Sequence, residues 1–200
     1  MEAFDSSSEA WLGIKNGFES GRLAHAYVIV GSPRGDGLRF AESFLRLLFC
    51  EGAEKPCGEC SACRQVEAHS HVDTLWIEPL SKSRQILAED VRALIKRMTQ
   101  TSFGGGWKAG VILCADCMNE SSENALLKTL EEPPSRSILL LVTDSANALL
   151  PTIISRCQKI TLSAGAVGPL DEVWREALMA ILRELPPSGG LNAARSASRL

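Results

Sequence analysis

The sequence of 200 residues contains no apolar run that approaches about 20 residues, the length that a membrane-spanning helix needs. Residues 1–9 are acidic and rich in serine, so we expect no signal peptide. Basic residues are not in excess, because 21 Lys and Arg stand against 24 Asp and Glu. Since affinity for nucleic acid comes mainly from clustered Lys and Arg, this charge balance argues against a surface that binds DNA by bulk charge. These absences predict an intracellular, soluble, cytoplasmic protein without membrane association.

The seven cysteines do not suggest a disulfide framework, because a reducing compartment keeps thiols free and makes their spacing more informative than their number. Three of them lie in or beside apolar segments, where a cysteine acts as a small hydrophobic residue. We assign no chemistry to these three, which are Cys114, Cys117 and Cys157. The other four lie close together in residues 50–63.

Hydrophobic residues make up 45% of the chain and charged residues 22%, as in ordinary globular proteins. The length allows one sizeable core and the beginning of a second unit. Residues 163–169 have the small residues, glycines and proline of a linker, and residues 170–185 have the pattern of one amphipathic helix. We therefore expect a core domain over residues 1–163, followed over 164–200 by a linker and a short helical C-terminal segment.

The apolar pattern predicts a doubly wound α/β domain with five parallel strands. Short apolar runs without alternation are typical of strands that are covered on both faces, and they span residues 27–30, 74–77, 111–115, 138–143 and 159–162. Helical periodicity spans residues 40–49, 89–98 and 122–130, and the last helix stops before Pro133. Strands therefore alternate with helices.

A glycine-rich loop over residues 31–39 joins the first strand to the following helix, which is the layout of a phosphate loop. A working loop, GxxxxGK[ST], needs a lysine for the β and γ phosphates and a hydroxyl for Mg²⁺. Leucine and arginine occupy these two positions, and Asp36 adds a carboxylate where an anion would bind. We therefore predict that the loop is degenerate and binds no nucleotide; its marker positions are Gly35, Gly37, Leu38 and Arg39.

The acidic residues that would hold Mg²⁺ after the strand at 111–115 are also missing. Leu113 and Cys114 occupy those positions, and Asp116 follows two residues later. We expect Asp116 to cap or orient the next turn rather than to bind a metal. Two separate losses predict that the chain has no ATPase activity of its own.

The four clustered cysteines have the spacing of a structural zinc site, with two Cys-x2-Cys pairs that share one cysteine and a further thiolate upstream. Gly58 supplies the tight turn that such a knuckle needs. An iron–sulfur cluster is the main alternative. The ferredoxin pattern, however, spaces its cysteines by two, two and three residues and places a proline after the last one, whereas Arg64 follows Cys63 here. Unliganded thiols are the other alternative. The expected zinc ligands are Cys50, Cys57, Cys60 and Cys63.

Four segments together carry a resemblance to a known family: residues 22–27, the cysteine knuckle, residues 124–134 and residues 155–157, which are Ser-Arg-Cys. Over roughly residues 10–163 the chain resembles the AAA+ subunits of the bacterial replicative clamp loader. Within that family the ATP-binding gamma/tau subunits keep an intact phosphate loop. The delta-prime type commonly lacks one but keeps the zinc knuckle and the Ser-Arg-Cys motif, and the chain is similar to this type.

The resemblance implies an AAA+ domain with a zinc-knuckle insertion and no ATP bound in cis. It implies that the four cysteines hold zinc and that Arg156 is a trans arginine finger for the ATP of an adjacent gamma/tau subunit, a role that suits a permanently charged guanidinium. Thr143 matches the polar sensor position. The family continues into a helical lid and collar, so residues 164–200 are expected to be a linker and the start of the lid, or a truncated C-terminal region.

Four further residues match motif positions of the family. For His25 we expect a structural hydrogen bond, since no nucleophile or carboxylate partner is evident nearby. Lys128 is expected to be a surface charge on a helix, and Glu131 and Glu132 to form a solvated helix end.

The resemblance predicts a non-hydrolysing clamp-loader subunit of the DNA polymerase III holoenzyme, without polymerase activity of its own. Its expected partners are the gamma/tau and delta subunits and, through the complex, the sliding clamp and primer-template DNA. One alternative is an active AAA+ ATPase with an unorthodox site, acting in DNA recombination or helicase loading. Another is a zinc-knuckle module that binds nucleic acid directly, which the acidic composition disfavours.

Overall fold

The computed structural model describes residues 8–79, 85–103 and 106–162, all within the unit formed by residues 1–163. The linker and helix predicted over 164–200 lie outside the described residues. No helix among the described residues is both long and apolar enough to cross a bilayer. The elements are, in chain order, α1 (Glu9–Glu19), β1 (Ala26–Val30), α2 (Asp36–Phe49), α3 (Ser61–Glu67), β2 (Thr74–Ile77), α4 (Ala88–Met98), β3 (Lys108–Leu113), η1 (Ala115–Cys117), α5 (Glu120–Glu131), β4 (Ser137–Thr143), η2 (Ala146–Ala148), α6 (Pro151–Ile154) and β5 (Gln158–Thr161).

The five strands form one parallel sheet in the order β2-β3-β4-β1-β5. The central strand β4 pairs on both sides, so that Leu140 lies between Tyr27 of β1 and Val111 of β3. Strands β3 and β4 are buried along their whole length, which explains why their sequences are apolar without alternation. The predicted five-stranded parallel sheet flanked by helices is confirmed.

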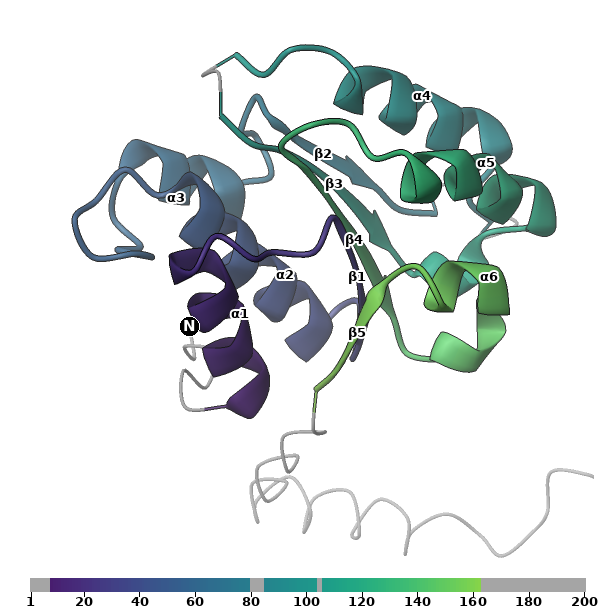
Figure 1. Ribbon diagram of the computed structural model, residues 1–200, viewed down its shortest axis with the longest axis horizontal. Coiled ribbons are helices and arrows are strands. Elements are labelled where there is room, and N and C mark those ends of the chain that lie inside the picture. The colour runs from purple at the N-terminus through teal and green to yellow at the C-terminus, as the bar shows by residue number, and fades with distance from the viewer. Residues whose placement is uncertain (1–7, 80–84, 104–105, 163–200) are drawn as a thin grey trace, which may run out of the picture. The chain divides into compact units, whose positions relative to one another are not determined.

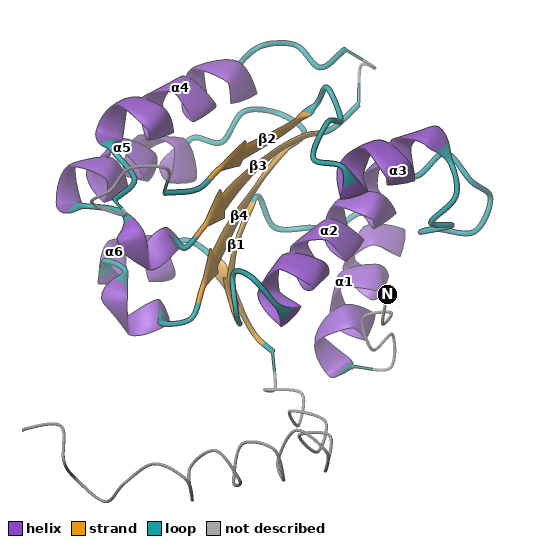
Figure 2. Ribbon diagram, turned by 180° about the vertical axis from the view of Figure 1, so that it is seen from behind, coloured by secondary structure: helices purple, strands orange, loops and turns teal. Residues whose placement is uncertain are grey.

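Helices cover both faces of the sheet, as Figures 1 and 2 show from opposite sides. Helices α1, α2 and α3 lie on one face, where Tyr27 packs edge-on against Phe44 of α2 at 5.1 Å between ring centroids. Helices α4, α5 and α6 lie on the other face and bury a second apolar cluster that includes Leu126 and Ile153. The sheet therefore separates two hydrophobic cores, one under each layer of helices.

Three helices were not predicted from the sequence. Helix α1 is capped by Ser8, whose Oγ accepts a hydrogen bond from Trp11 N at 3.3 Å, and it buries Trp11 and Ile14. Helices α3 and α6 have only 7 and 4 residues. Such short helices complete at most two turns, which is too few for an apolar period of 3.6 residues to appear.

Two element boundaries differ from the prediction and affect the candidate site. Helix α2 begins at Asp36 rather than at residue 40, so the second half of the glycine-rich segment is the first turn of a helix. Strand β3 ends at Leu113 rather than at residue 115. The cause is Cys114, whose φ of 53° turns the chain into the left-handed region and away from the sheet.

Candidate functional site

The carboxyl ends of β1, β3 and β4 bring the glycine-rich loop, Asp116 and Thr143 to the same edge of the sheet. Thr143 is fully buried at the end of β4. Its Oγ1 donates a hydrogen bond to Asp116 Oδ1 at 2.7 Å and accepts one from Ser145 N at 3.0 Å. The predicted sensor hydroxyl is therefore bound to a side chain of its own chain. Asp116 lies in the turn η1 after β3, and this hydrogen bond ties the turn to the end of β4; the turn itself has no side-chain cap among the described residues.

The glycine-rich loop directs its backbone N–H groups at acceptors within the loop. Asp36 Oδ1 accepts hydrogen bonds from Ser32 N at 2.7 Å and from Gly37 N at 2.9 Å. Ser32 O accepts from Gly35 N at 3.0 Å and from Leu38 N at 3.3 Å. In a phosphate loop such N–H groups point at the ligand. Here a carboxylate and a carbonyl of the protein receive them.

Gly37 is required for this close loop packing. A Cβ atom at this position would lie 2.8 Å from Gly31 O and 2.8 Å from Ser32 O. The glycine of the phosphate-loop pattern is thus explained by the approach of two loop carbonyls to the first turn of α2. A bound nucleotide is not needed to explain why this residue is glycine.

A cavity of about 470 Å³ lies beside the start of α2, and Leu38 and Leu113 are among the residues that line it. In an active site these positions would carry a lysine and a carboxylate. Trp76 of β2 lies in the same wall. Charged side chains, among them Arg34, Glu78 and Asp90, also line this cavity, so the two leucines remove the specific attachments for phosphate and Mg²⁺ without making the cavity apolar.

Arg156 lies in the short link between α6 and β5, and its side chain is 36% exposed. Its Nη2 donates to Glu131 Oε1 at 2.7 Å, and its Nη1 donates to Thr152 O at 3.0 Å and to Ser155 Oγ at 3.5 Å. These are its hydrogen-bond partners among the described residues, so the guanidinium does not bind the chain's own glycine-rich loop. It remains accessible from solvent on the α5–α6 face.

Helix α6 is held in place by a residue that the sequence analysis missed. Glu123 of α5 is 5% exposed, and its Oε1 accepts a hydrogen bond from Leu150 N at 2.9 Å, directly before α6 begins. Burial raises the pKa of this carboxyl group. A signal was present, because Glu123 shares the helical face of Leu126 and Leu130, which are both buried.

Glu123→Ala is expected to destabilise the domain by about 1–3 kcal/mol, because it leaves the N–H of the half-buried Leu150 without its acceptor and removes the packed atoms of a buried side chain. Urea unfolding of the chain measures this loss. Glu120→Ala is the matched control, since Glu120 is an exposed glutamate in the same first turn of α5. Equal midpoints for the two variants would show that the Glu123 contact contributes nothing.

The remaining motif residues behave in different ways. His25 accepts a hydrogen bond from Leu139 N at 2.9 Å through its backbone carbonyl, while its ring Nε2 is buried without a hydrogen-bond partner among the described residues. The structural hydrogen bond expected of the His25 side chain is therefore not found at Nε2, and the backbone bond is one that any residue at this position could make. Lys128 and Glu132 are exposed, as predicted. Glu131 differs from the prediction, because it is paired with Arg156 instead of being only a solvated helix end.

The three scattered cysteines are half-buried, and Cys117 and Cys157 pack against the core under α4 and α5. Burial raises the pKa of the Cys157 thiol to about 12 and also raises that of Cys114. A thiol with a raised pKa is a poor nucleophile at neutral pH. The assignment of no chemistry to these residues agrees with this environment.

The four clustered cysteines come together at the end of α2 and the start of α3, with all sulfur atoms within 4.8 Å of one another. Cys50 Sγ lies 3.4 Å from Cys57 Sγ and 4.0 Å from Cys60 Sγ. Tetrahedral thiolates around zinc, with Zn–S bonds of about 2.3 Å, stand about 3.8 Å apart. The donor set and its spacing therefore fit a closed site with four sulfur ligands.

Backbone hydrogen bonds favour the thiolate form at Cys57 and Cys60, whereas burial raises the pKa of the Cys63 thiol to about 12. N–H groups of Gly52 and Cys57 donate to Cys50 Sγ, both at 3.3 Å, and Cys63 N donates to Cys60 Sγ at 3.4 Å. Hydrogen bonds from the backbone of Glu51 and Cys63 lower the pKa of the Cys60 thiol to about 6. Gly58 has a φ of 76°, so the turn between the cysteines uses the left-handed conformation that glycine adopts readily.

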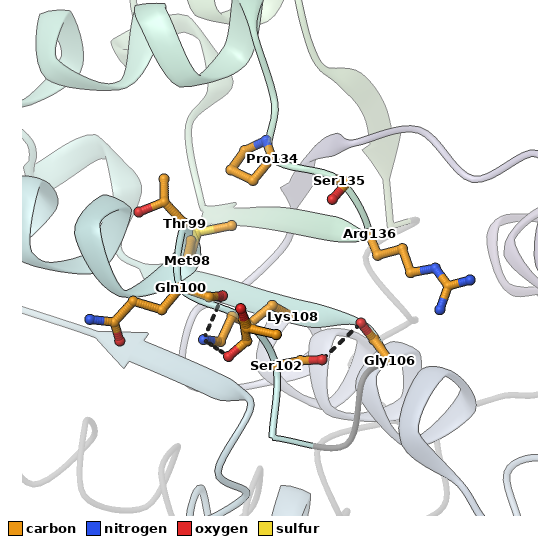
Figure 3. A pocket seen from close by; sticks show the side chains of 10 residues that line it. Met98, Thr99, Gln100, Ser102, Gly106, Lys108, Pro134, Ser135 and Arg136 are labelled. Carbon is orange, nitrogen blue, oxygen red and sulfur yellow. Dashed lines mark hydrogen bonds between the residues drawn. The ribbon is translucent and has the colours of Figure 1, made fainter.

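A second pocket, of about 230 Å³, lies at the opposite edge of the sheet and contains the buried Lys108. Lys108 Nζ donates to the carbonyls of Arg97, Gln100 and Thr101 at 3.0, 3.0 and 3.2 Å. Figure 3 shows this side chain directed at the end of α4 while Arg136 points away from it. All three ammonium hydrogens are thus used to cap a helix C-terminus, where a cation is favourable, and the pocket offers no free lysine to an anion.

Comparison with known proteins identifies the family. A family model described as DNA polymerase III, delta subunit, matches residues 7–165. DNA polymerase III subunit delta' of Pseudomonas aeruginosa is 40% identical over 156 residues, which cover 76% of this chain and 47% of that protein. The Bacillus subtilis subunit delta' is 35% identical over 146 residues, covering 72% of this chain and 44% of that protein.

A related subunit type matches as well. DNA polymerase III subunit tau of Escherichia coli is 36% identical over 153 residues, or 76% of this chain and 23% of that protein. Among solved structures, a gamma subunit-related protein of Thermotoga maritima superposes with a TM-score of 0.58 at 20% identity, covering 84% of this chain and 53% of that one; this likeness concerns the fold. The chain spans about half the length of the delta' relatives. It belongs to the DNA polymerase III delta subunit family, among the members of the delta-prime type.

Proposed function

We propose that this chain is a non-hydrolysing clamp-loader subunit in DNA replication, which supplies Arg156 as a trans arginine finger to the ATP of a neighbouring gamma/tau subunit. One contrast carries the proposal. The chain's own phosphate loop is occupied by Asp36, whereas the Arg156 guanidinium lies outside that loop and is 36% exposed. A subunit built in this way can stabilise a neighbour's phosphate charge without holding a nucleotide itself.

The proposed partners follow from membership of the family and from the names of its relatives. Subunits named delta' and tau match over most of this chain, which supports assembly with gamma/tau and delta subunits. The sliding clamp and primer-template DNA would be handled through the complex. The cysteine cluster would hold a structural zinc ion, because four protein thiolates leave no coordination site open for a substrate.

The alternative of an unorthodox active ATPase requires nucleotide binding by the chain itself. We expect no saturable binding of ATP or ADP to the isolated chain at affinities tighter than about 1 mM, because four loop N–H groups already donate to Asp36 Oδ1 and Ser32 O and a leucine replaces the phosphate-binding lysine. Equilibrium binding of labelled nucleotide measures this. Micromolar affinity would contradict the proposal and support the ATPase. Reconstitution with gamma/tau and delta subunits, followed by clamp-loading assays with and without the chain, tests the assembly.

A further inference from the structure

The contact between Arg156 and Glu131 joins the link after α6 to the last residue of α5. The distance from Nη2 to Oε1 is 2.7 Å, which is short for a charge-assisted hydrogen bond. On the other side of the guanidinium, Nη1 donates to Thr152 O at 3.0 Å. Two neighbouring nitrogens of the planar group are thus held from two directions, so its orientation is defined.

The helices beneath this contact are packed against the sheet and joined to each other. Helix α5 buries Leu126 and Leu130 against the sheet, and α6 is attached to α5 by the partly buried hydrogen bond from Leu150 N to Glu123 Oε1. Glu123 and Glu131 lie eight positions apart, about 12 Å along the helix axis. Helix α5 therefore holds the segment that carries the arginine at two points, one at the start of α6 and one at the guanidinium itself.

The exposure of the ion pair argues against a role in stability. The two side chains are 36% and 53% exposed, and pairs of this kind contribute little to folding. An exposed carboxylate is also a partner that a guanidinium can share or exchange at small cost. An arginine has five N–H donors in a fixed fork, so contacts to Glu131, Thr152 and Ser155 leave donors for phosphate oxygens.

We propose that Glu131 is a positioning residue for Arg156, whose carboxylate orients the guanidinium on the α5–α6 face before a neighbouring subunit's nucleotide reaches it. The inference rests on the proposed finger role of Arg156. Without Glu131 the long arginine side chain would sample many rotamers. Each encounter with the neighbour's nucleotide would then have to offset the conformational entropy lost on ordering it. Glu131 is thus expected to affect the rate of hydrolysis and not the binding of nucleotide by the neighbour.

The experiment uses the complex reconstituted with the full chain and follows DNA-stimulated ATP hydrolysis in a single turnover. The phase that Arg156→Ala removes reports the site that this arginine reaches. In that phase we expect Glu131→Ala to lower the rate about 3- to 10-fold, with the ATP concentration for half-maximal amplitude unchanged. Glu131→Gln keeps an acceptor oxygen and should recover most of the rate.

Glu132→Ala is the matched control, because it removes the neighbouring exposed carboxylate, which makes no hydrogen bond or ion pair among the described residues. It should turn over like the wild-type complex. In the Arg156→Ala background, Glu131→Ala should have no further effect, since it acts through the arginine. Equal rates for Glu131→Ala and Glu132→Ala, a faster Glu131→Ala complex, or an additional loss in the double variant would each overturn the positioning role. If Arg156→Ala itself removes no phase, the finger assignment fails first.

Discussion

Arg156→Ala is expected to slow hydrolysis at the neighbouring ATP site on the order of 10³-fold, because an arginine finger stabilises the charge that spreads over the transferred phosphoryl group. Any other ATP sites in the complex would continue to turn over, so a steady-state rate underestimates the effect. The sharper measurement is the amount of ATP hydrolysed per complex in the first turnover after primer-template DNA is added. That amount should fall by the contribution of a single site.

The loss should not come from misfolding, since the Arg156 side chain is exposed and its ion pair contributes little to stability. The melting temperature of the variant chain checks this point. Arg156→Lys keeps the charge but not the fork that matches phosphate oxygens, and should recover only part of the activity. Arg64→Ala removes another exposed arginine and should hydrolyse ATP like the wild type. Unchanged first-turnover hydrolysis by the Arg156→Ala complex would disprove the finger role.

Cys60→Ser is expected to reduce the zinc content from about one ion per chain to near zero, because a closed tetrahedral site loses one of its four ligands. The knuckle should then lose its structure. Residues 51–59 are exposed or only half-buried and bring almost no apolar surface to the core. In such segments the free energy of metal binding supplies the free energy of folding. Metal analysis and hydrogen exchange over residues 50–63 measure the two effects.

Cys117→Ser serves as the control for this variant, because Cys117 is a half-buried cysteine outside the cluster. It should retain zinc and normal exchange in the knuckle. Wild-type protein purified without any bound metal would contradict the zinc assignment. Iron together with acid-labile sulfide in place of zinc would instead support the iron–sulfur alternative.

Much of the fold follows from patterns that are local in the chain. The apolar runs that became β3 and β4 are buried on both faces, so their composition alone distinguishes them from exposed strands. The cysteine cluster was predictable for the same reason, because its ligands lie within 14 consecutive residues and a short loop can close around one ion. Helices α3 and α6 escaped prediction because their length gives periodicity no room to appear.

The contacts of the candidate site were not predictable in this way. Thr143 and Asp116 are 27 residues apart in sequence, Leu150 and Glu123 also 27, and Arg156 and Glu131 25. Which side chains meet across such separations depends on the order of strands in the sheet and on how α5 packs against α6. Neither is visible in a pattern that reports only neighbours along the chain.

The sequence by itself determined that the phosphate loop lacks its lysine and hydroxyl, that four cysteines can share one metal ion, and that an arginine follows the serine at position 155. These are properties of residue type and short spacing. Only the tertiary structure decided that Asp36 accepts the loop's own N–H groups, and that Glu131 at the end of α5 accepts a hydrogen bond from Arg156. The physical reason is that a hydrogen bond needs its two heavy atoms within about 3 Å, and only the folded backbone sets that distance, both inside the loop and between residues 25 positions apart.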